Sequence, residues 1–200
     1  MKQIITLIII FISILSTAQS NILSVEDLPF ENQLNSYFKD INNELNTFEG
    51  TWLYTNGNTS LKIKLVKYER ANQIDYFEDL ILGGYQYIEN GIEKINKLDH
   101  ADNLDFLYES TSVIYGNHLY KNCQYLSFDD CIEGQTKLVL SIFDPITNNH
   151  SGDLILKKVN FNGEEAIKAS IIFSYSGTYP NGIPPEPTLP WQQEYLLIKR

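Results

Sequence analysis

Two cysteines are the residues of this chain whose type and spacing most directly specify chemistry. Cys123 and Cys131 are separated by seven residues in the stretch NCQYLSFDDC. A lone pair of cysteines in an oxidising compartment forms a disulfide, and closing so short a loop contributes about 2 kcal/mol or a little more. Two metal ligands are the alternative, but the spacing is not the Cys-x-x-Cys of zinc sites and His118 is the one histidine nearby. We expect a disulfide between Cys123 and Cys131.

An acidic stretch offers oxygen atoms that could bind calcium. Asp99, Asp102, Asn103 and Asp105 lie close together in the sequence, and an exported protein meets millimolar calcium. The stretch lacks the fixed glycine and the acidic twelfth residue of a helix-loop-helix calcium site. A solvated acidic loop is the simpler interpretation of this cluster.

Catalytic motifs are absent from the sequence. It contains no G-x-S-x-G, H-E-x-x-H, phosphate-binding glycine loop or Cys-x-x-Cys, and His100, His118 and His150 are dispersed along it. We therefore expect neither an enzyme nor a bound cofactor or metal, although a catalytic pair assembled in space by an unfamiliar fold stays open.

A proline-rich segment carries the candidate binding residues. Ser176 to Pro190, SGTYPNGIPPEPTLP, contains five prolines, which favour an extended loop over regular pairing. Aromatic side chains with a polar tip often line ligand pockets or partner surfaces. The candidate rim of a binding site is Tyr179, Pro184, Pro185 and Trp191, and the alternative is a loop that these residues merely pin to the side of the fold.

The N-terminal sequence pattern predicts a signal peptide. Lys2 precedes an apolar run from Ile4 to Leu15, and the small residues Ser16 and Ala18 follow. The run is shorter than the roughly 20 residues of a membrane-spanning helix. We expect cleavage after Ala18, with cleavage after Ser20 as the alternative. Because no cysteine follows the run for lipid attachment, we expect a periplasmic or secreted chain without a membrane anchor.

The mature chain, residues 19–200, is expected to form one domain. Without Lys2, 14 of the 15 basic side chains remain against 25 acidic ones, a net charge of -11. Phosphate groups would repel so acidic a chain, which argues against nucleic acid as a partner.

The pattern after the signal peptide predicts one helix. Apolar residues recur at the three-and-four spacing of a helical face, and Gly50 supplies a stop. We expect an amphipathic helix over about residues 29–47, which includes Phe30, Leu34, Tyr37, Phe38, Ile41 and Leu45.

From residue 51 the apolar period changes to two, the period of a strand. In SLKIKLVKY, the apolar side chains Leu61, Ile63 and Leu65 share one face, and lysines occupy the other. The breaks TNGN, ENG and NFNGE are hairpin signals. Nine strands are predicted near residues 51–55, 60–69, 78–88, 92–98, 112–120, 136–143, 152–159, 165–175 and 191–199. Closing such a run of hairpins removes exposed edges, so we expect a single antiparallel β-barrel of about 8–10 strands over residues 51–200, an all-β fold preceded by the helix.

The junction FEGTWLY and the C-terminal YLLIKR resemble the G-x-W signature and final strand of lipocalins and related calycin barrels. This resemblance implies that Gly50 and Trp52 close one end of the barrel and that Arg200, or Lys199, packs on the tryptophan. The long preceding helix and the missing Thr-Asp-Tyr turn depart from that family. The whole pattern, including LILGGYQYIENG, is also similar to an uncharacterised family of exported proteins from Bacteroidetes-type bacteria.

Two functions follow as hypotheses. The first is a non-enzymatic exported barrel that binds a small apolar or amphipathic ligand in a hollow interior. The second is a barrel with a solid core that binds another exported protein or a glycan through its outer surface. Small inward side chains would indicate a cavity, and interlocked large ones would indicate a solid core.

Overall fold

The computed structural model describes residues 21–27, 34–103, 113–123, 130–147, 150–175, 182 and 185–200. The predicted signal peptide, residues 1–18, lies outside the described residues. Within the described ranges, no helix is both long and apolar enough to cross a membrane. The elements, with η for a 3-10 helix, are β1 Ile22–Ser24, η1 Val25–Asp27, β2 Tyr37–Lys39, η2 Leu45–Thr47, β3 Gly50–Asn56, β4 Thr59–Asn72, β5 Phe77–Glu89, β6 Ile92–Asn96, η3 Leu98–Asp102, β7 Ile114–Tyr120, β8 Lys137–Phe143, β9 His150–Phe161, β10 Glu164–Tyr175 and β11 Glu194–Lys199.

The alternating segments form strands because one side of each can be buried. Leu61, Ile63 and Leu65 of β4 are buried, and Lys62 and Lys64 between them are partly exposed. All nine predicted strands are confirmed, with bounds that shift by a few residues.

Two of the predicted hairpin turns have the backbone that an Asn-Gly pair favours. Asn90 and Gly91, between β5 and β6, have φ angles of 51° and 81°, and Asn162 and Gly163, between β9 and β10, have 54° and 87°. Tight hairpin turns of this kind require positive φ at both central residues, which asparagine and glycine tolerate best. The sequence signals for these turns are confirmed.

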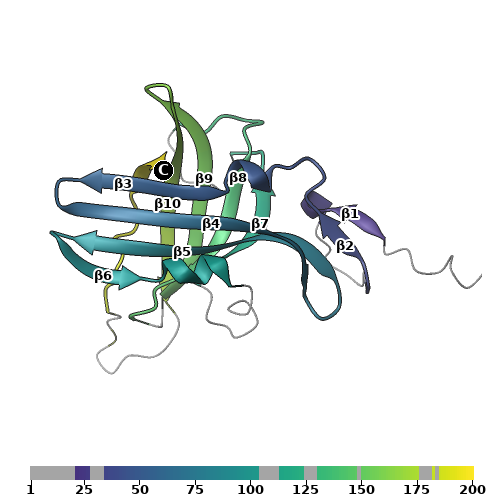
Figure 1. Cartoon of the computed structure of the whole chain (residues 1–200), viewed down its shortest axis with the longest axis horizontal. Coiled ribbons are helices and arrows are strands. Elements are labelled where there is room, and N and C mark those ends of the chain that lie inside the picture. The colour runs from purple at the N-terminus through teal and green to yellow at the C-terminus, as the bar shows by residue number, and fades with distance from the viewer. Residues whose placement is uncertain are drawn as a thin grey trace, which may run out of the picture.

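Eight strands close into an antiparallel barrel, as predicted. The order of neighbours is β5-β4-β3-β11-β10-β9-β8-β7, and the pairing of β7 with β5 completes the circle. In Figure 1, β3, β4 and β5 run across β8, β9 and β10 at a steep angle. The remaining predicted strand, β6, lies outside this circle and pairs with β5. One edge of β5 therefore pairs with β7 over one stretch and with β6 over another.

Large apolar side chains fill the interior of the barrel. They form one contiguous cluster in which the inward residues of facing strands meet. A cavity that could hold a ligand would leave its lining accessible to water, yet inward residues of five different strands are 0% exposed: Trp52, Ile63, Leu140, Leu156 and Ile171. The described side chains therefore make a solid core.

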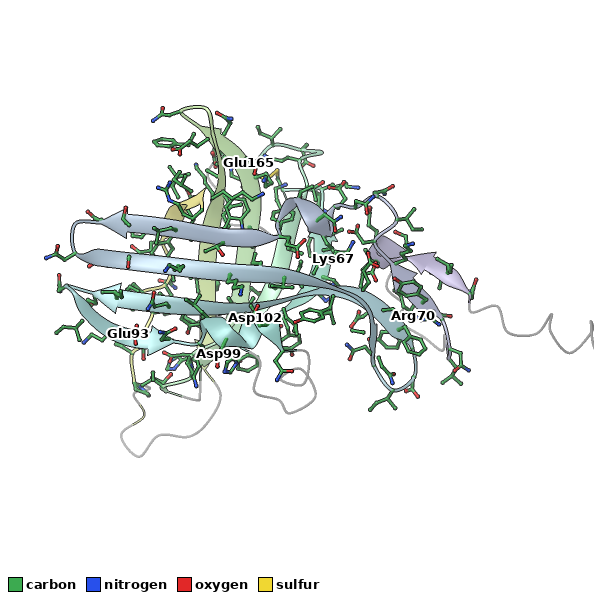
Figure 2. The ribbon with its side chains drawn as sticks, in the orientation of Figure 1. Lys67, Arg70, Glu93, Asp99, Asp102 and Glu165 are labelled. Carbon is green, nitrogen blue, oxygen red and sulfur yellow. A yellow bond between two sulfur atoms is a disulfide. The ribbon has the colours of Figure 1, made fainter. Side chains whose placement is uncertain are left out.

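The 3-10 helix η3 covers the outer face of β4 and β5. Its approach is possible because Gly84 has no side chain, since a Cβ at that position would lie 1.9 Å from the carbonyl oxygen of Lys97. The Lys97 N–H donates to the Tyr85 carbonyl at 2.9 Å, and the Lys64 ammonium contacts the Asp102 carboxylate at 2.6 Å. Figure 2 shows Asp99 and Asp102 on this side of the barrel.

The predicted N-terminal helix is wrong over the residues that the structure describes. Tyr37 and Phe38 lie in β2 and pair in parallel with Phe77 and Glu78 of β5, and only the short η2 is helical. Leu34 and Ile41, which a helix would bury on the same face, are 69% and 54% exposed. Tertiary pairing with the projecting end of β5 overrides the local helical pattern. Residues 28–33 of the predicted helix lie outside the described ranges.

A buried aspartate holds this N-terminal layer to the ribbon that β4 and β5 form beyond the barrel. Asp79 is fully buried and accepts hydrogen bonds from the Tyr37 hydroxyl at 2.6 Å and from the Asp40 and Arg70 N–H groups at 2.9 Å. Arg70 has a φ angle of 54°, at a register shift of the ribbon. Burial, and then the bond to Asp79, raises the pKa of Tyr37. Figure 2 labels Lys67, whose ammonium pairs with Asp40 at 3.0 Å, and Arg70 in this region.

Replacement of Gly84 tests the packing of η3 on β5. We expect Gly84→Ala to lower the free energy of unfolding by about 1–3 kcal/mol, because the new methyl group overlaps the backbone of Lys97. Urea denaturation monitored by tryptophan fluorescence measures the change. Gln86→Ala, two residues along the same face of β5, is the control and should change the stability by less than about 0.5 kcal/mol. Equal stability of the two variants would contradict this packing.

Candidate functional site

Trp52 lies at the end of the barrel where β3 begins. Its side chain is fully buried, and its indole N–H donates to the Phe48 carbonyl at 2.8 Å. The ammonium groups of Lys158 and Lys199 lie 4.8 and 5.4 Å from the centre of the ring. Gly50 makes room for one of them, since a Cβ there would lie 3.1 Å from Cε of Lys199. A tryptophan covered by two cations thus occupies this end.

The basic residues at this end differ in part from those that the resemblance implied. Lys199, which the resemblance gave as the alternative to Arg200, lies over the tryptophan. The Arg200 guanidinium instead contacts Glu164 at 3.8 Å, and the backbone N–H of Arg200 donates to the Thr51 carbonyl. Lys158 was not foreseen. It continues the inward-facing series after Leu154 and Leu156 on β9, so strict alternation along that strand could have indicated it.

One carboxylate joins the two lysines. Glu165 contacts the ammonium groups of Lys199 at 2.8 Å and Lys158 at 3.4 Å, and Figure 2 labels it near the β9–β10 hairpin. The hydrogen bond from Lys199, followed by the charge of Lys158, lowers the pKa of Glu165. Glu165 offsets part of the positive charge of the two lysines, at an end of the barrel that the tryptophan already fills. This arrangement closes the end of the barrel.

The opposite end of the barrel holds the described part of the proline-rich segment. Leu189 is fully buried in the core, and Trp191 packs against the core while staying partly exposed. The Tyr195 hydroxyl donates to the Pro190 carbonyl at 2.7 Å, and the Tyr195 ring meets Tyr54 edge-on at 5.1 Å. Burial raises the pKa of Tyr195. The segment therefore closes this end with Leu189.

Asp144 ties this segment to the turn between β8 and β9. Its buried carboxylate accepts N–H groups from Ile146 at 2.9 Å and Thr147 at 3.3 Å in its own turn. It also accepts the N–H of Thr188 at 2.5 Å from the proline-rich segment. A single carboxylate with three donors thus fixes two loops that are far apart in the sequence.

Four exposed or partly exposed apolar residues lie close in the sequence to Asp144 and to the segment that it binds, and together we call them the apolar rim. It consists of Phe143, Ile146, Pro185 and Trp191. Phe143 is 37% and Ile146 is 58% exposed, although both lie within two residues of the buried Asp144. Of the four rim residues predicted from the sequence, Pro185 is exposed and Trp191 is partly exposed, and Tyr179 and Pro184 lie outside the described residues. Phe143 and Ile146 were missed because nothing in the sequence links their turn to the proline-rich segment.

The predicted disulfide between Cys123 and Cys131 is confirmed, with a Cα–Cα distance of 5.9 Å. Beside it, three lysines lie directly opposite one another on neighbouring strands of the outer wall, Lys137 of β8, Lys157 of β9 and Lys168 of β10. We call them the lysine row. Lys137 and Lys157 are fully buried.

Groups next to the disulfide cover the lysine row. The Asp130 carboxylate contacts the ammonium groups of Lys157 and, at 2.7 Å, of Lys168. Lys137 donates to the Asn122 carbonyl at 3.0 Å and to the Ile132 carbonyl at 3.4 Å. Hydrogen bonds from Lys157 and then Lys168 lower the pKa of Asp130 to about 2. The lysines are thus structural partners of the disulfide-bridged loop.

The remaining candidate residues do not converge on one point. In the described ranges, no group of three or more histidine, cysteine or acidic side chains is placed to hold a metal ion. Asp102 of the acidic cluster pairs with Lys64 through both carboxylate oxygens, Asp99 is exposed, and Asp105 lies outside the described residues. His150 bonds Thr147 at 2.8 Å within the β8–β9 turn.

Comparison with known proteins gives one match. Residues 1–200 match the model of DUF6705, described as a family of unknown function. No curated protein and no solved structure matches the chain. The expectation of an uncharacterised family is thereby confirmed, and the resemblance to lipocalins stays an expectation.

Substitution of the closing tryptophan tests its role. We expect Trp52→Phe to lower the free energy of unfolding by about 2–3 kcal/mol, because it removes a buried hydrogen bond and leaves unfilled volume. The matched variant Lys199→Met keeps the packing and removes one cation over the ring, so its loss should be about 0.5–1 kcal/mol. Thermal and urea unfolding followed by circular dichroism measure both. A Trp52→Phe variant as stable as the parent would contradict the closing role.

Proposed function

Since this chain belongs to DUF6705, we propose its function from its own geometry: it is an exported, non-enzymatic β-barrel with a solid core that binds another exported protein through the apolar rim. The observation that carries the proposal is the pairing of a filled interior with an exposed apolar surface. The inward side chains leave the interior no water-accessible lining at its centre, so a partner must bind outside. The apolar rim follows the end of β8 and precedes the start of β11, whereas Trp52 pairs with the other end of β11.

The way the rim is held supports binding. Ile146 exposes most of its side chain, which folding alone does not favour. Asp144 nevertheless fixes the backbone of Ile146 and of Thr188 with hydrogen bonds to its carboxylate, so the apolar groups beside them are presented on a rigid frame. Binding then needs little ordering of the surface, which lowers its entropic cost. Partly exposed tryptophan and exposed apolar groups are typical of the centre of protein interfaces.

Export is supported by two features. The sequence begins with the pattern of a signal peptide, and the cysteines are joined in a disulfide, which persists in oxidising compartments outside the cytoplasm. The net charge of -11 for residues 19–200 disfavours nucleic acid and anionic lipid surfaces as partners, which leaves protein as the class that an apolar rim fits best.

Native mass spectrometry of the mature chain, purified from its own host, tests the solid core. We expect the mass of residues 19–200 with one disulfide and no retained small molecule, and no shift when fatty acids or detergent-like amphiphiles are added. The reason is that the central side chains already occupy the volume that a ligand would need. A bound amphiphile of defined mass would contradict the solid core and favour the ligand-binding hypothesis.

The partner site is tested with two matched substitutions of exposed isoleucines. Ile146→Asp places a charge in the rim, and Ile74→Asp places the same charge at the tip of the β4–β5 ribbon, where Ile74 is 94% exposed. In pull-downs from envelope and culture-fluid fractions, we expect Ile146→Asp to lower recovery of a specific protein by roughly tenfold or more, the effect of losing an interface anchor. Ile74→Asp should recover it as the parent does.

A photo-crosslinking residue at position 146 completes this test, because it should join the recovered protein to the rim. Both aspartate variants must keep the parental circular dichroism spectrum for the comparison to hold. Equal recovery by the two variants, or crosslinking from position 74 instead of 146, would contradict the assignment of the rim as the binding surface.

A further inference from the structure

The lysine row would be electrostatically unfavourable without the hydrogen-bonding groups that cover it. Like charges directly opposite one another on neighbouring strands repel, and burial of an ammonium group is costly unless it is hydrogen-bonded or paired. Lys157 lies opposite both Lys137 and Lys168, and two of the three are fully buried on the outer wall of the barrel. Their burial therefore depends on the groups that cover them.

Those groups are placed by the disulfide. Asn122 precedes Cys123, and Asp130 and Ile132 flank Cys131, so each covering residue is next to a bridged cysteine. The Asp130 carboxylate bridges Lys157 and Lys168, and its carbonyl accepts a further bond from Lys157 at 3.1 Å. The disulfide fixes the two flanks of the cover against each other, which limits how far they can separate.

We propose that the Cys123–Cys131 disulfide is a redox-sensitive clamp that keeps Lys137 and Lys157 buried, and that its reduction exposes the lysine row while the barrel stays closed. Closing the clamp joins the two sulfur atoms, and the thiols lose two electrons and two protons to a low-molecular-weight disulfide, which is reduced to two thiols. The reverse reaction with a dithiol such as dithiothreitol opens it. The reduced chain made before export therefore carries a basic stripe on an otherwise acidic protein, and oxidation after export hides it.

The change should stay local for two reasons. The wall beneath the lysines is the β8–β9–β10 sheet, whose strands pair along their lengths, and its inward side chains belong to the core. The base of the bridged loop also has a bond that does not involve sulfur, from the Gly134 N–H to the Lys121 carbonyl at 2.7 Å. The clamp lies at the Lys137 end of β8, and the apolar rim begins at Phe143 at the other end, so this inference does not depend on the proposed partner binding.

The test is amine labelling of the mature chain with an acetylating reagent, followed by peptide mass spectrometry. We compare the oxidised chain, the chain reduced with dithiothreitol and alkylated, and the double variant Cys123→Ser and Cys131→Ser. Labelling of Lys137 and Lys157 should be at least about tenfold faster in the last two, from the lost restraint on the loop. Lys94 of β6, which is exposed in the intact protein, is the internal reference and should not change.

The outcomes separate the clamp from its alternatives. Faster labelling of the two buried lysines with unchanged Lys94 and an unchanged strand signal in circular dichroism supports the clamp. Rates for Lys137 and Lys157 within about twofold of the oxidised chain overturn it, because the cover would then hold without the disulfide. Loss of the strand signal on reduction also overturns it, because the disulfide would then support the whole barrel. The variant Asp130→Asn, with the disulfide intact, should speed labelling of Lys157 more than that of Lys137, since it removes the carboxylate that Lys157 contacts.

Discussion

Closure of the sheet between β5 and β7 is the constraint on which the rest of the structure depends. Three residue pairs make this seam, Ile81 to Gly83 against Ile114 to Gly116, because β2 and β6 pair with other parts of the same edge of β5. Gly83 allows the seam to form, since a Cβ there would lie 2.7 Å from Leu65 and 3.0 Å from Ile114. Once the seam forms, alternation sends half of every strand inward, and those side chains meet in one cluster. The solid core is thus a consequence of closing eight strands that carry large inward residues. The charged and polar contacts that distinguish this barrel lie at its ends and on its outer wall.

At both ends of the barrel and on its outer wall, a charged side chain holds neighbouring segments in place through ion pairs and hydrogen bonds. At one end of the barrel, two lysines that share Glu165 lie over the ring of Trp52. At the other end, the Asp144 carboxylate accepts hydrogen bonds from the N–H groups of two loops. On the wall, Asp130 bridges the lysine row. Asp144, Lys137 and Lys157 are buried, and buried charges are costly when unpaired, so these three fix their neighbours in one arrangement. This explains how loops with few apolar residues of their own hold defined positions on the barrel.

The fold followed from the sequence wherever local signals and long-range pairing agree. Alternating strands and Asn-Gly turns are specified within a few residues, and both were predicted correctly. The helix over residues 29–47 failed because the spacing of Tyr37 and Phe38 fits a helix, while the free end of β5 supplies a partner that no local pattern records. The disulfide was predictable from two cysteines in a chain whose sequence predicts export. Asp144, Lys158 and the lysine row were not, since their roles arise from which strands become neighbours and which way each side chain points.

The position of β11 in the barrel limits the order in which the strands can pair during folding. This strand lies between β3 and β10, so the first and last strands of the barrel are neighbours, and β3 has its second neighbour only when β11 is in place. A chain emerging from a ribosome can form its hairpins in order as they appear, because those contacts are local. It cannot close the circle until Glu194–Lys199 has been made, so β3 keeps a bare edge until then. Closure through β11 therefore joins strands that are far apart in the sequence, and unpaired strand edges of this kind are prone to aggregation before they close.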